Sequence, residues 1–194
     1  TFYYDRGNLD EALSILQTQQ LPILEKNGDV HEKALTLGQI SDIYIRYGNL
    51  DEALRLVQSE ALPVLEKFGD TRGKARMMGR VADIYYARGQ VDEALRIRRN
   101  VQMPIYKTLG DTRGKAYVMG KIADIHLARG EVLVARSILN DEVLPAYEWL
   151  GDVRGKAMTM GRLADSYLYK ALWKALRIRH DQMLEYHKLG DARE

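Results

Sequence analysis

The sequence predicts an all-α protein built of stacked helix–turn–helix repeats, and two observations lead to this prediction. The first is a period of 41 residues: the dipeptide Gly-Asp recurs at spacings of 41, 41, 41 and 39. A fixed period in this range is typical of repeat arrays. The second is that each period holds two helical patterns and no strand-like alternation. The prolines keep the same register, at Pro22, Pro63, Pro104 and Pro145.

The copies are similar enough to define repeat boundaries. Residues 71–111 and 112–152 share 21 identities in 41 positions. We expect one array over residues 1–194: a partial repeat 1–29, repeats 30–70, 71–111 and 112–152, a degenerate repeat 153–191, and the start of a further repeat at 192–194. The sequence resembles a piece of a longer array. Neither end shows a polar cap, so we expect self-association through the uncapped ends.

The first helix of each repeat, which we call helix A, has a clear start, end and buried face. In repeat 71–111, Asp70 is a good N-cap, Gly69 ends the preceding helix and Gly89 ends this one. The expected buried stripe follows helical spacing. It comprises Ala75, Met78, Val81, Ala82 and Tyr85.

The second helix, helix B, contains the proline. Asp92 and Glu93 favour its first turn, where the helix dipole stabilises acidic side chains. The expected inner face comprises Val91, Ala94, Leu95, Val101, Ile105 and Leu109. Pro104 lacks an N–H group and clashes with the carbonyl four residues earlier, so helix B either kinks there or ends near Met103, with a short separate helix following.

Composition excludes several classes of function. The 194 residues are 46% hydrophobic and 29% charged, which is ordinary for a globular protein. The absence of cysteine removes disulfides, thiol nucleophiles and cysteine-ligated metals. No catalytic or nucleotide-binding motif is present, and the four histidines lack the i, i+4 spacing of a helical metal pair. We therefore expect no enzyme activity, no metal and no cofactor, and we take a cytoplasmic location as the simplest assumption.

These residues resemble the tetratricopeptide repeat (TPR) family, in a version lengthened to about 41 residues from the usual 34 or so. The segment VADIYYARGQVDEAL carries most of the likeness. The small position of the family falls on Ser41, Ala82, Ala123 and Ala164, its tyrosine position on Tyr3, Tyr44, Tyr85, His126 and Tyr167, and its tryptophan position on Leu37, Met78, Met119 and Met160. The resemblance implies a right-handed α-solenoid whose helices A line a concave groove.

A row of repeated polar residues is the first candidate site on that groove. Aspartates recur 41 residues apart, each preceded at i−3 by a polar or basic residue. The row comprises Asp42, Asp83, Asp124 and Asp165, with Gln39, Arg80, Lys121 and Arg162. Two readings stay open: the row contacts a ligand, or it forms i, i+3 ion pairs that keep the face neutral. The neighbouring glycines, Gly38, Gly79, Gly120 and Gly161, indicate close helix contact.

A mixed amphipathic strip is the second candidate. It comprises Thr36, Arg76, Tyr117 and Met158, together with Ile45, Tyr86, Leu127 and Leu168. Such a strip suits an extended or helical peptide. The carboxylate-binding lysine and asparagine of some family members are glycine and aspartate here, so the resemblance implies a different ligand chemistry. We predict a protein-interaction scaffold that holds a peptide or protein segment in the helix-A groove, without contact with a membrane.

Two other functions remain open. The array could serve as a regulatory or oligomerisation arm of a larger bacterial signalling protein, or, as a weaker possibility, bind RNA. Residues 1–70 carry 6 basic and 12 acidic side chains, against 23 and 15 in residues 71–194. The basic clusters that could favour nucleic acid lie on helices B, which we expect to face outward, and aromatic residues do not alternate with the basic ones there. These clusters are Arg96, Arg98 and Arg99, and Arg177, Arg179 and His180.

The last repeat departs from the pattern. Where other copies have ARGQVDEAL, it has YKALWKAL, without the turn glycine and one residue shorter. Either residues 165–180 run as one continuous helix, which would invite exchange between chains, or a tighter glycine-free turn replaces the usual one. The degenerate repeat is therefore a second possible site of self-association.

Overall fold

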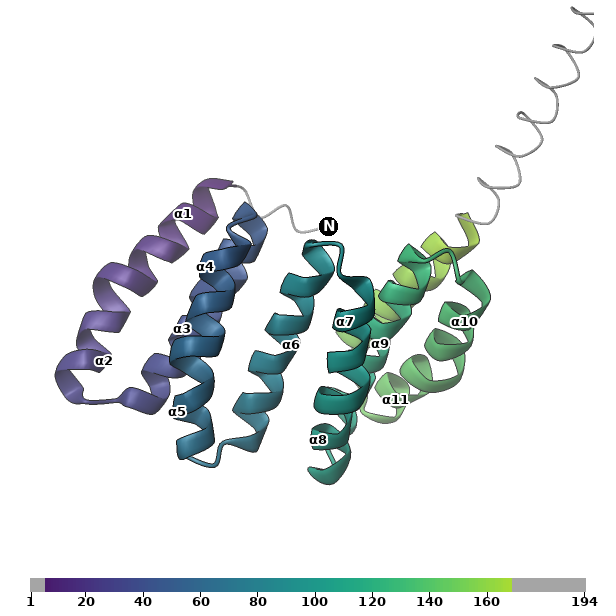
Figure 1. The fold of residues 1–194 in the computed structure, drawn as a ribbon. Coiled ribbons are helices and arrows are strands. Elements are labelled where there is room, and N and C mark those ends of the chain that lie inside the picture. Colours follow the sequence, from purple (N-terminus) through teal and green to yellow (C-terminus); the bar gives the residue numbers. More distant parts are fainter. Residues whose placement is uncertain (1–5, 169–194) are drawn as a thin grey trace, which may run out of the picture. The chain divides into compact units, whose positions relative to one another are not determined.

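The computed structural model describes residues 6–168, which form helices joined by short turns, without a strand among them (Figure 1). Helices A are single α-helices: α3 (Val30–Tyr47), α6 (Thr71–Ala87), α9 (Thr112–Ala128) and residues 153–168. Each helix B has a π-helical segment between two α-helices. The segments are α1 (Arg6–Ile15), η1 (Leu16–Gln20) and α2 (Leu21–Asn27); α4 (Leu50–Arg55), η2 (Leu56–Ala61) and α5 (Leu62–Lys67); α7 (Val91–Ile97), η3 (Arg98–Gln102) and α8 (Met103–Thr108); and α10 (Val132–Ser137), η4 (Ile138–Val143) and α11 (Leu144–Trp149). The predicted all-α class with helix–turn–helix repeats is confirmed.

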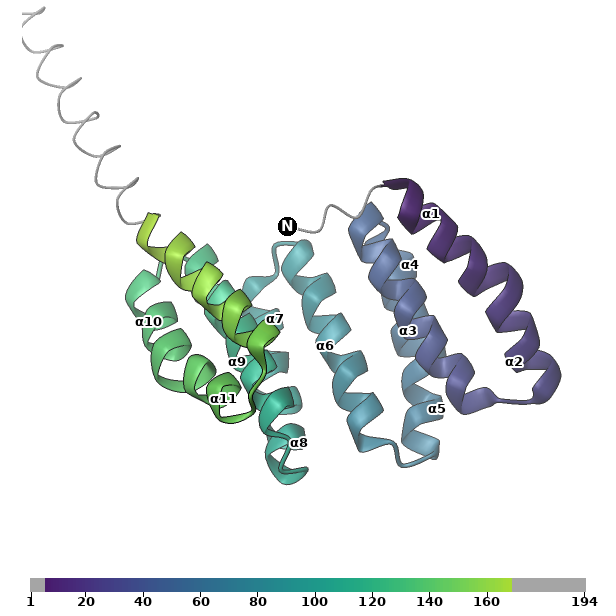
Figure 2. The same ribbon diagram turned by 180° about the vertical axis from the view of Figure 1, so that it is seen from behind.

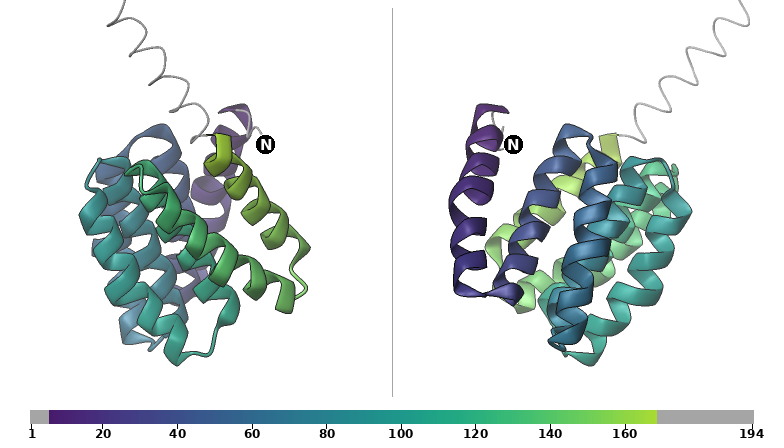
Figure 3. Two further views of the ribbon diagram at one scale, coloured as in Figure 1. Left: turned by 90° about the vertical axis from the view of Figure 1, so that its right-hand side faces the viewer. Right: turned by 60° about the vertical axis from the view of Figure 1, so that its left-hand side comes forward.

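The chain divides into two units, Thr1–Val118 and Met119–Glu194. In the first unit, helices A and B alternate from α1 to α8 and pack side by side, from purple to teal in Figures 1 and 3. In the second unit, the end of α9, the helix B from α10 to α11 and the helix of residues 153–168 pack together (Figure 2).

The helix boundaries follow from local chemistry. The carboxylates of Asp70, Asp111 and Asp152 each accept a hydrogen bond from the backbone N–H three residues later, at 2.7, 2.8 and 2.9 Å. These are N-caps, as the sequence predicts for Asp70. Gly69 and Gly89 have φ of +67° and +76°, a left-handed conformation that glycine adopts without strain, so both predicted helix ends are confirmed.

The buried face of helix A is partly different from the predicted stripe. Ala75, Val81 and Ala82 are buried as predicted, but Met77 and Ile84 are fully buried in place of Met78 and Tyr85, which are half-buried. The reason is that α6 packs against α3 as well as against its own helix B, so a second side of the helix is covered. A prediction that assumes one buried face for helix A therefore misses the residues that pack against the second neighbouring helix.

A π turn precedes the proline in each helix B within residues 6–168. In repeat 71–111 the N–H of Met103 donates to the carbonyl of Arg98, five residues earlier, and Gln102 and Met103 keep right-handed helical dihedral angles. The chain therefore stays helical up to Pro104, and the predicted alternative of a helix end near Met103 is wrong. The wider turn accommodates the missing proline donor without a break.

This π turn also changes which residues of helix B are buried. Ala94, Arg98, Gln102 and Tyr106 are buried at strict four-residue spacing, as are Ala53, Val57, Ala61 and Leu65, and Ala135, Leu139, Val143 and Tyr147. In an α-helix each four-residue step overshoots a full turn by about 40°, and the π segment offsets that drift. The predicted inner face is therefore wrong beyond Leu95: Val101 and Ile105 are half-buried and Leu109 is exposed.

Candidate functional site

The aspartate row joins neighbouring repeats. The guanidinium of Arg80 in α6 donates two hydrogen bonds to the carboxylate of Asp42 in α3, at 2.9 and 2.8 Å. The Arg80 side chain is 17% exposed and that of Asp42 is 50% exposed. In the second unit, Nε of Arg162 lies 2.9 Å from Asp124 in α9. Both basic residues reach back by 38 positions, so these pairs connect one helix A to the next.

Of the two readings of the row, ion pairing is observed for Arg80 and Arg162, but with Asp42 and Asp124 of the preceding helix A and not with the aspartate at i+3. Successive helices A lie close enough for the cation to meet the aspartate of the preceding helix. The pairing keeps the helix-A surface close to neutral at these positions. Lys121 is partly buried and engaged with a neighbour, and Asp165 is exposed.

Asp83 of helix A forms an ion pair with a buried arginine of helix B, Arg98. The side chain of Arg98 is only 2% exposed, and its Nη2 atom lies 2.6 Å from a carboxylate oxygen of Asp83. Its other contacts are a hydrogen bond to Oε1 of Gln102 at 2.8 Å and a long one to the carbonyl of Gly79 at 3.5 Å. The expectation that Arg98 belongs to an outward basic cluster is wrong, because Arg98 lies one turn after Ala94 on the buried face of helix B, whereas Arg96 and Arg99 are exposed.

Glycine makes room for this network. A Cβ atom on Gly79 would lie 2.4 Å from Nε2 of Gln102, and one on Gly38 would lie 2.4 Å from Cε of Met77. Close helix contact, as the sequence indicates for these glycines, is therefore observed at both positions. Gly161 differs, since a Cβ atom there would meet nothing within 4 Å.

The amphipathic strip is exposed only in part. Arg76 of α6 and Tyr117 of α9 occupy equivalent positions in neighbouring helices, and both are exposed, Tyr117 by 45%. Tyr86 is 39% exposed near the end of α6. Thr36, in contrast, is buried and its hydroxyl accepts a hydrogen bond from Gln20, so its place in the strip is wrong.

The remaining strip positions vary in exposure. Ile45 and Leu127 are half-buried, whereas Met158 and Leu168 are exposed.

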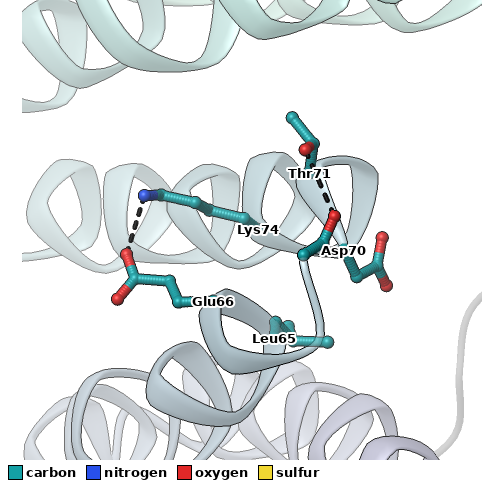
Figure 4. Close-up of a pocket in the computed structure, with 6 residues that line it drawn as sticks. Leu65, Glu66, Asp70, Thr71 and Lys74 are labelled. Atoms are coloured by element: carbon teal, nitrogen blue, oxygen red, sulfur yellow. Dashed lines mark hydrogen bonds and ion pairs between the residues drawn. The ribbon is translucent and has the colours of Figure 1, made fainter.

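A shallow open pocket of about 270 Å³ lies where α5 meets α6 (Figure 4). Leu65, Lys74 and Asp70 are among the residues that line it, and Lys74 forms an ion pair with Glu66 at 2.7 Å. Burial alone would raise the pKa of Asp70, but hydrogen bonds from the Gly73 amide and His31, with the charge of Arg76, hold it below its usual value. With its charges already paired, this pocket is a weak candidate for a ligand.

The histidines within residues 6–168 have side-chain partners. His31 lies 3.0 Å from Asp70 and stacks at a tilt on Phe68. His126, at the tyrosine position, is buried and contacts Glu131. Across these residues no group of three or more histidines, cysteines or carboxylates could hold a metal ion.

Within residues 6–168 no helix is long and apolar enough to cross a membrane. His180 and His187 lie outside the described residues. Residues 169–180, the later part of the expected continuous helix, also lie outside them.

No family model and no curated protein matches the chain. Among solved structures, the chain is similar to a Signal Transduction ATPase with Numerous Domains (STAND) protein with a tetratricopeptide repeat sensor from Pyrococcus horikoshii. The two share 21% identity at a TM-score of 0.67 over 87% of this chain, which spans only 25% of that protein.

A second similar structure holds the nearly identical TPR-like repeats of a kinesin light chain from Podosopora anserina. It shares 17% identity at a TM-score of 0.54, over 84% of this chain and 89% of that one. A point variant of that protein matches equally well, with a TM-score of 0.54. The chain therefore has the TPR-like helical repeat fold that its period and turn segments resemble.

Proposed function

We propose that the chain is a protein-interaction scaffold that binds a peptide or protein segment along its helix-A surface. The observation that carries the proposal is that, within residues 6–118, this surface has both side chains that pair between repeats and side chains that are exposed. Arg80 is engaged with Asp42 between repeats, while Tyr86, Tyr117 and Arg76 present exposed aromatic and cationic groups. Tyrosine and arginine are enriched at protein interfaces. Repetition supports binding over catalysis, because copying a unit extends a surface.

The experiment selects peptides from a displayed library of random sequences on the immobilised chain. Affinities of the selected peptides are then measured by fluorescence anisotropy. We expect Tyr86→Ala with Tyr117→Ala to weaken binding at least about ten-fold, or about 1.4 kcal/mol. Arg96→Ala and Arg99→Ala, which change exposed cations on helix B, are the matched controls and should have no effect. Equal loss in both variants would contradict the proposed surface.

A role as a regulatory arm of a larger protein is the second candidate. It is favoured by the similarity to the STAND protein, which has a tetratricopeptide repeat sensor and of which the matched segment spans a quarter. RNA binding is less favoured, because Arg98 is buried and unavailable to phosphates. A salt titration separates the two kinds of ligand, since RNA affinity falls steeply with salt and peptide affinity falls modestly.

A further inference from the structure

The last described helix, residues 153–168, has an apolar face that is covered in the earlier repeats. Ala82 and Ala123 are fully buried at 0% exposure, whereas Ala164 at the equivalent position is exposed. Met160 on the same side is 54% exposed, whereas its counterparts Met78 and Met119 are partly buried. Exposure of this kind within one helix marks a surface that lacks its packing partner.

The opposite side of this helix is well packed. Thr159 and Ser166 are buried, and the guanidinium of Arg136 in α10 bonds to both the hydroxyl and the carbonyl of Ser166, at 3.0 and 2.7 Å. The same guanidinium lies 3.8 Å from the ring centre of Tyr167. The helix is thus anchored on the preceding repeat, while Met160 and Ala164 lie exposed on the side that helix B covers in the earlier repeats.

The earlier repeats show what belongs on the open side. In repeat 71–111, Gly79 of helix A meets Gln102 of helix B, and Asp83 binds Arg98 of helix B. At the positions equivalent to Gly79 and Asp83, the last repeat has Gly161 and Asp165. Gly161 has open space where Gly79 has its neighbour. A helix-B segment with an arginine opposite Asp165 would therefore complete this face.

The sequence that follows carries such a segment. Residues 175–179 have the same sequence, ALRIR, as residues 94–98, so Ala175 and Arg179 correspond to Ala94 and Arg98. Arginine stands at this position of helix B in repeat 71–111, while Val57 and Leu139 occupy it in the repeats on either side. Asp165 and Arg179 are thus the counterparts of Asp83 and Arg98. The match extends to Arg179; after it, one residue and the proline of the earlier helices B are missing before Gly190, in addition to the residue missing before Ala175.

The residue missing before Ala175 lies in the turn that would return this segment to its own helix A. The corresponding turns use Gly48, Gly89 and Gly130, with φ of +77°, +76° and +75°. The last repeat has no glycine between Gly161 and Gly190. Any other residue in this conformation costs about 1–2 kcal/mol, and a chain that does not turn can make the same contacts with a second copy.

We propose that the open face of residues 153–168 binds residues 171–187 of a second copy of this chain, and that the two copies exchange these segments reciprocally. The Asp165–Arg179 pair then forms between chains. The dimer completes the last repeat of both copies.

Charge exchange in the full chain tests this arrangement. Asp165→Arg and Arg179→Asp each place like charges across the contact, so each variant should dimerise at least about ten-fold more weakly by analytical ultracentrifugation. A mixture of the two should recover the dimer, because every contact then joins opposite charges. Arg96→Asp, at an exposed cation of α7, is the control that should leave the mass unchanged. A wild-type chain that stays monomeric at all concentrations, or a mixture without recovery, overturns the proposal.

Insertion of a glycine between Lys170 and Ala171 provides an independent test. The insertion restores both the length and the glycine of the earlier turns, so each chain should bind its own segment. The expected result is a monomer whose helix content by circular dichroism equals that of the wild type. Stacking through uncapped array ends would be insensitive to this change, so a dimer that survives the insertion overturns the exchange.

Discussion

The guanidinium of Arg98 and the carboxylate of Asp83 form an ion pair of 2.6 Å in which the arginine is buried and the aspartate partly exposed. The pair joins helix A to helix B within one repeat. By contrast, the Arg80–Asp42 pair joins one repeat to the next. The two kinds of pair are expected to contribute differently to stability, since the Arg98 side chain is almost fully buried whereas the Asp42 carboxylate is half exposed.

Arg98→Ala should therefore lower the free energy of unfolding by about 3 kcal/mol, from lost packing and a lost partner for Asp83. Arg98→Leu should lose less, because Leu139 fills the equivalent position in the next repeat and is fully buried there. Urea denaturation measures both values. Equal losses for the two variants would show that packing volume is unimportant at this position.

The Arg80–Asp42 pair should contribute a modest coupling between repeats. A double-mutant cycle with Arg80→Ala and Asp42→Ala is expected to give about 0.5–1 kcal/mol, because Asp42 is half exposed. The coupling should shrink at about 1 M salt, where screening acts within about 3 Å. A coupling near zero at low salt would mean that the observed geometry is not populated in solution.

Gly114→Ala should destabilise the first unit. Its Cβ atom would lie 2.5 Å from Cδ1 of Tyr106, which is only 5% exposed and enclosed. Overpacking of this kind costs about 1–3 kcal/mol, which exceeds the gain of about 1 kcal/mol in helix propensity. Adding Tyr106→Leu should recover part of the loss, since Leu65 stands opposite Gly73 at the equivalent positions. Thermal unfolding of both variants is the measurement, and a stabilised single variant would contradict the tight contact.

Asp70 should make stability depend on pH in the acid range. Its pKa in the folded chain lies below the ordinary value of 3.8, so the unfolded chain takes up a proton first as pH falls. The stabilisation is complete above the ordinary pKa and is lost as pH falls through the folded pKa. Asp70→Asn, which can still cap α6, should flatten this part of the profile. Unfolding followed by urea between about pH 2 and pH 6 tests it; parallel profiles for the two proteins would rule out the effect.

The sequence predicts the helices and their ends because these depend on local chemistry. Asp70, Gly69 and Gly89 act on the neighbouring backbone alone, so each has the same effect in any helical repeat. The position of Arg98 could not be predicted in this way. A charged residue in a basic run is usually exposed, but Arg98 lies one turn after the buried Ala94 and its side chain is 2% exposed. The four-residue spacing from Ala94 to Tyr106 was the available signal.

The ion-pair partner of each aspartate in the row could not be predicted from the sequence either. Arg80 is three residues from Asp83 along the helix, and nothing in the spacing distinguishes that aspartate from Asp42 in the preceding helix. The distance between adjacent helices decides, and this depends on Gly38, whose missing side chain leaves room for Met77. The burial of Thr36 has the same kind of cause, because Gln20 comes from a different helix.

The π turn before each proline has a consequence for protein engineering. Its one additional residue keeps the buried residues before and after the turn on the same side of helix B, facing the same neighbouring helix. Deleting a residue from Arg98–Gln102 would rotate everything beyond it by about 100°, moving Tyr106 out of the interior. Anyone who grafts or lengthens these modules should transfer the stretch from Ala94 to Tyr106 whole, as a cassette.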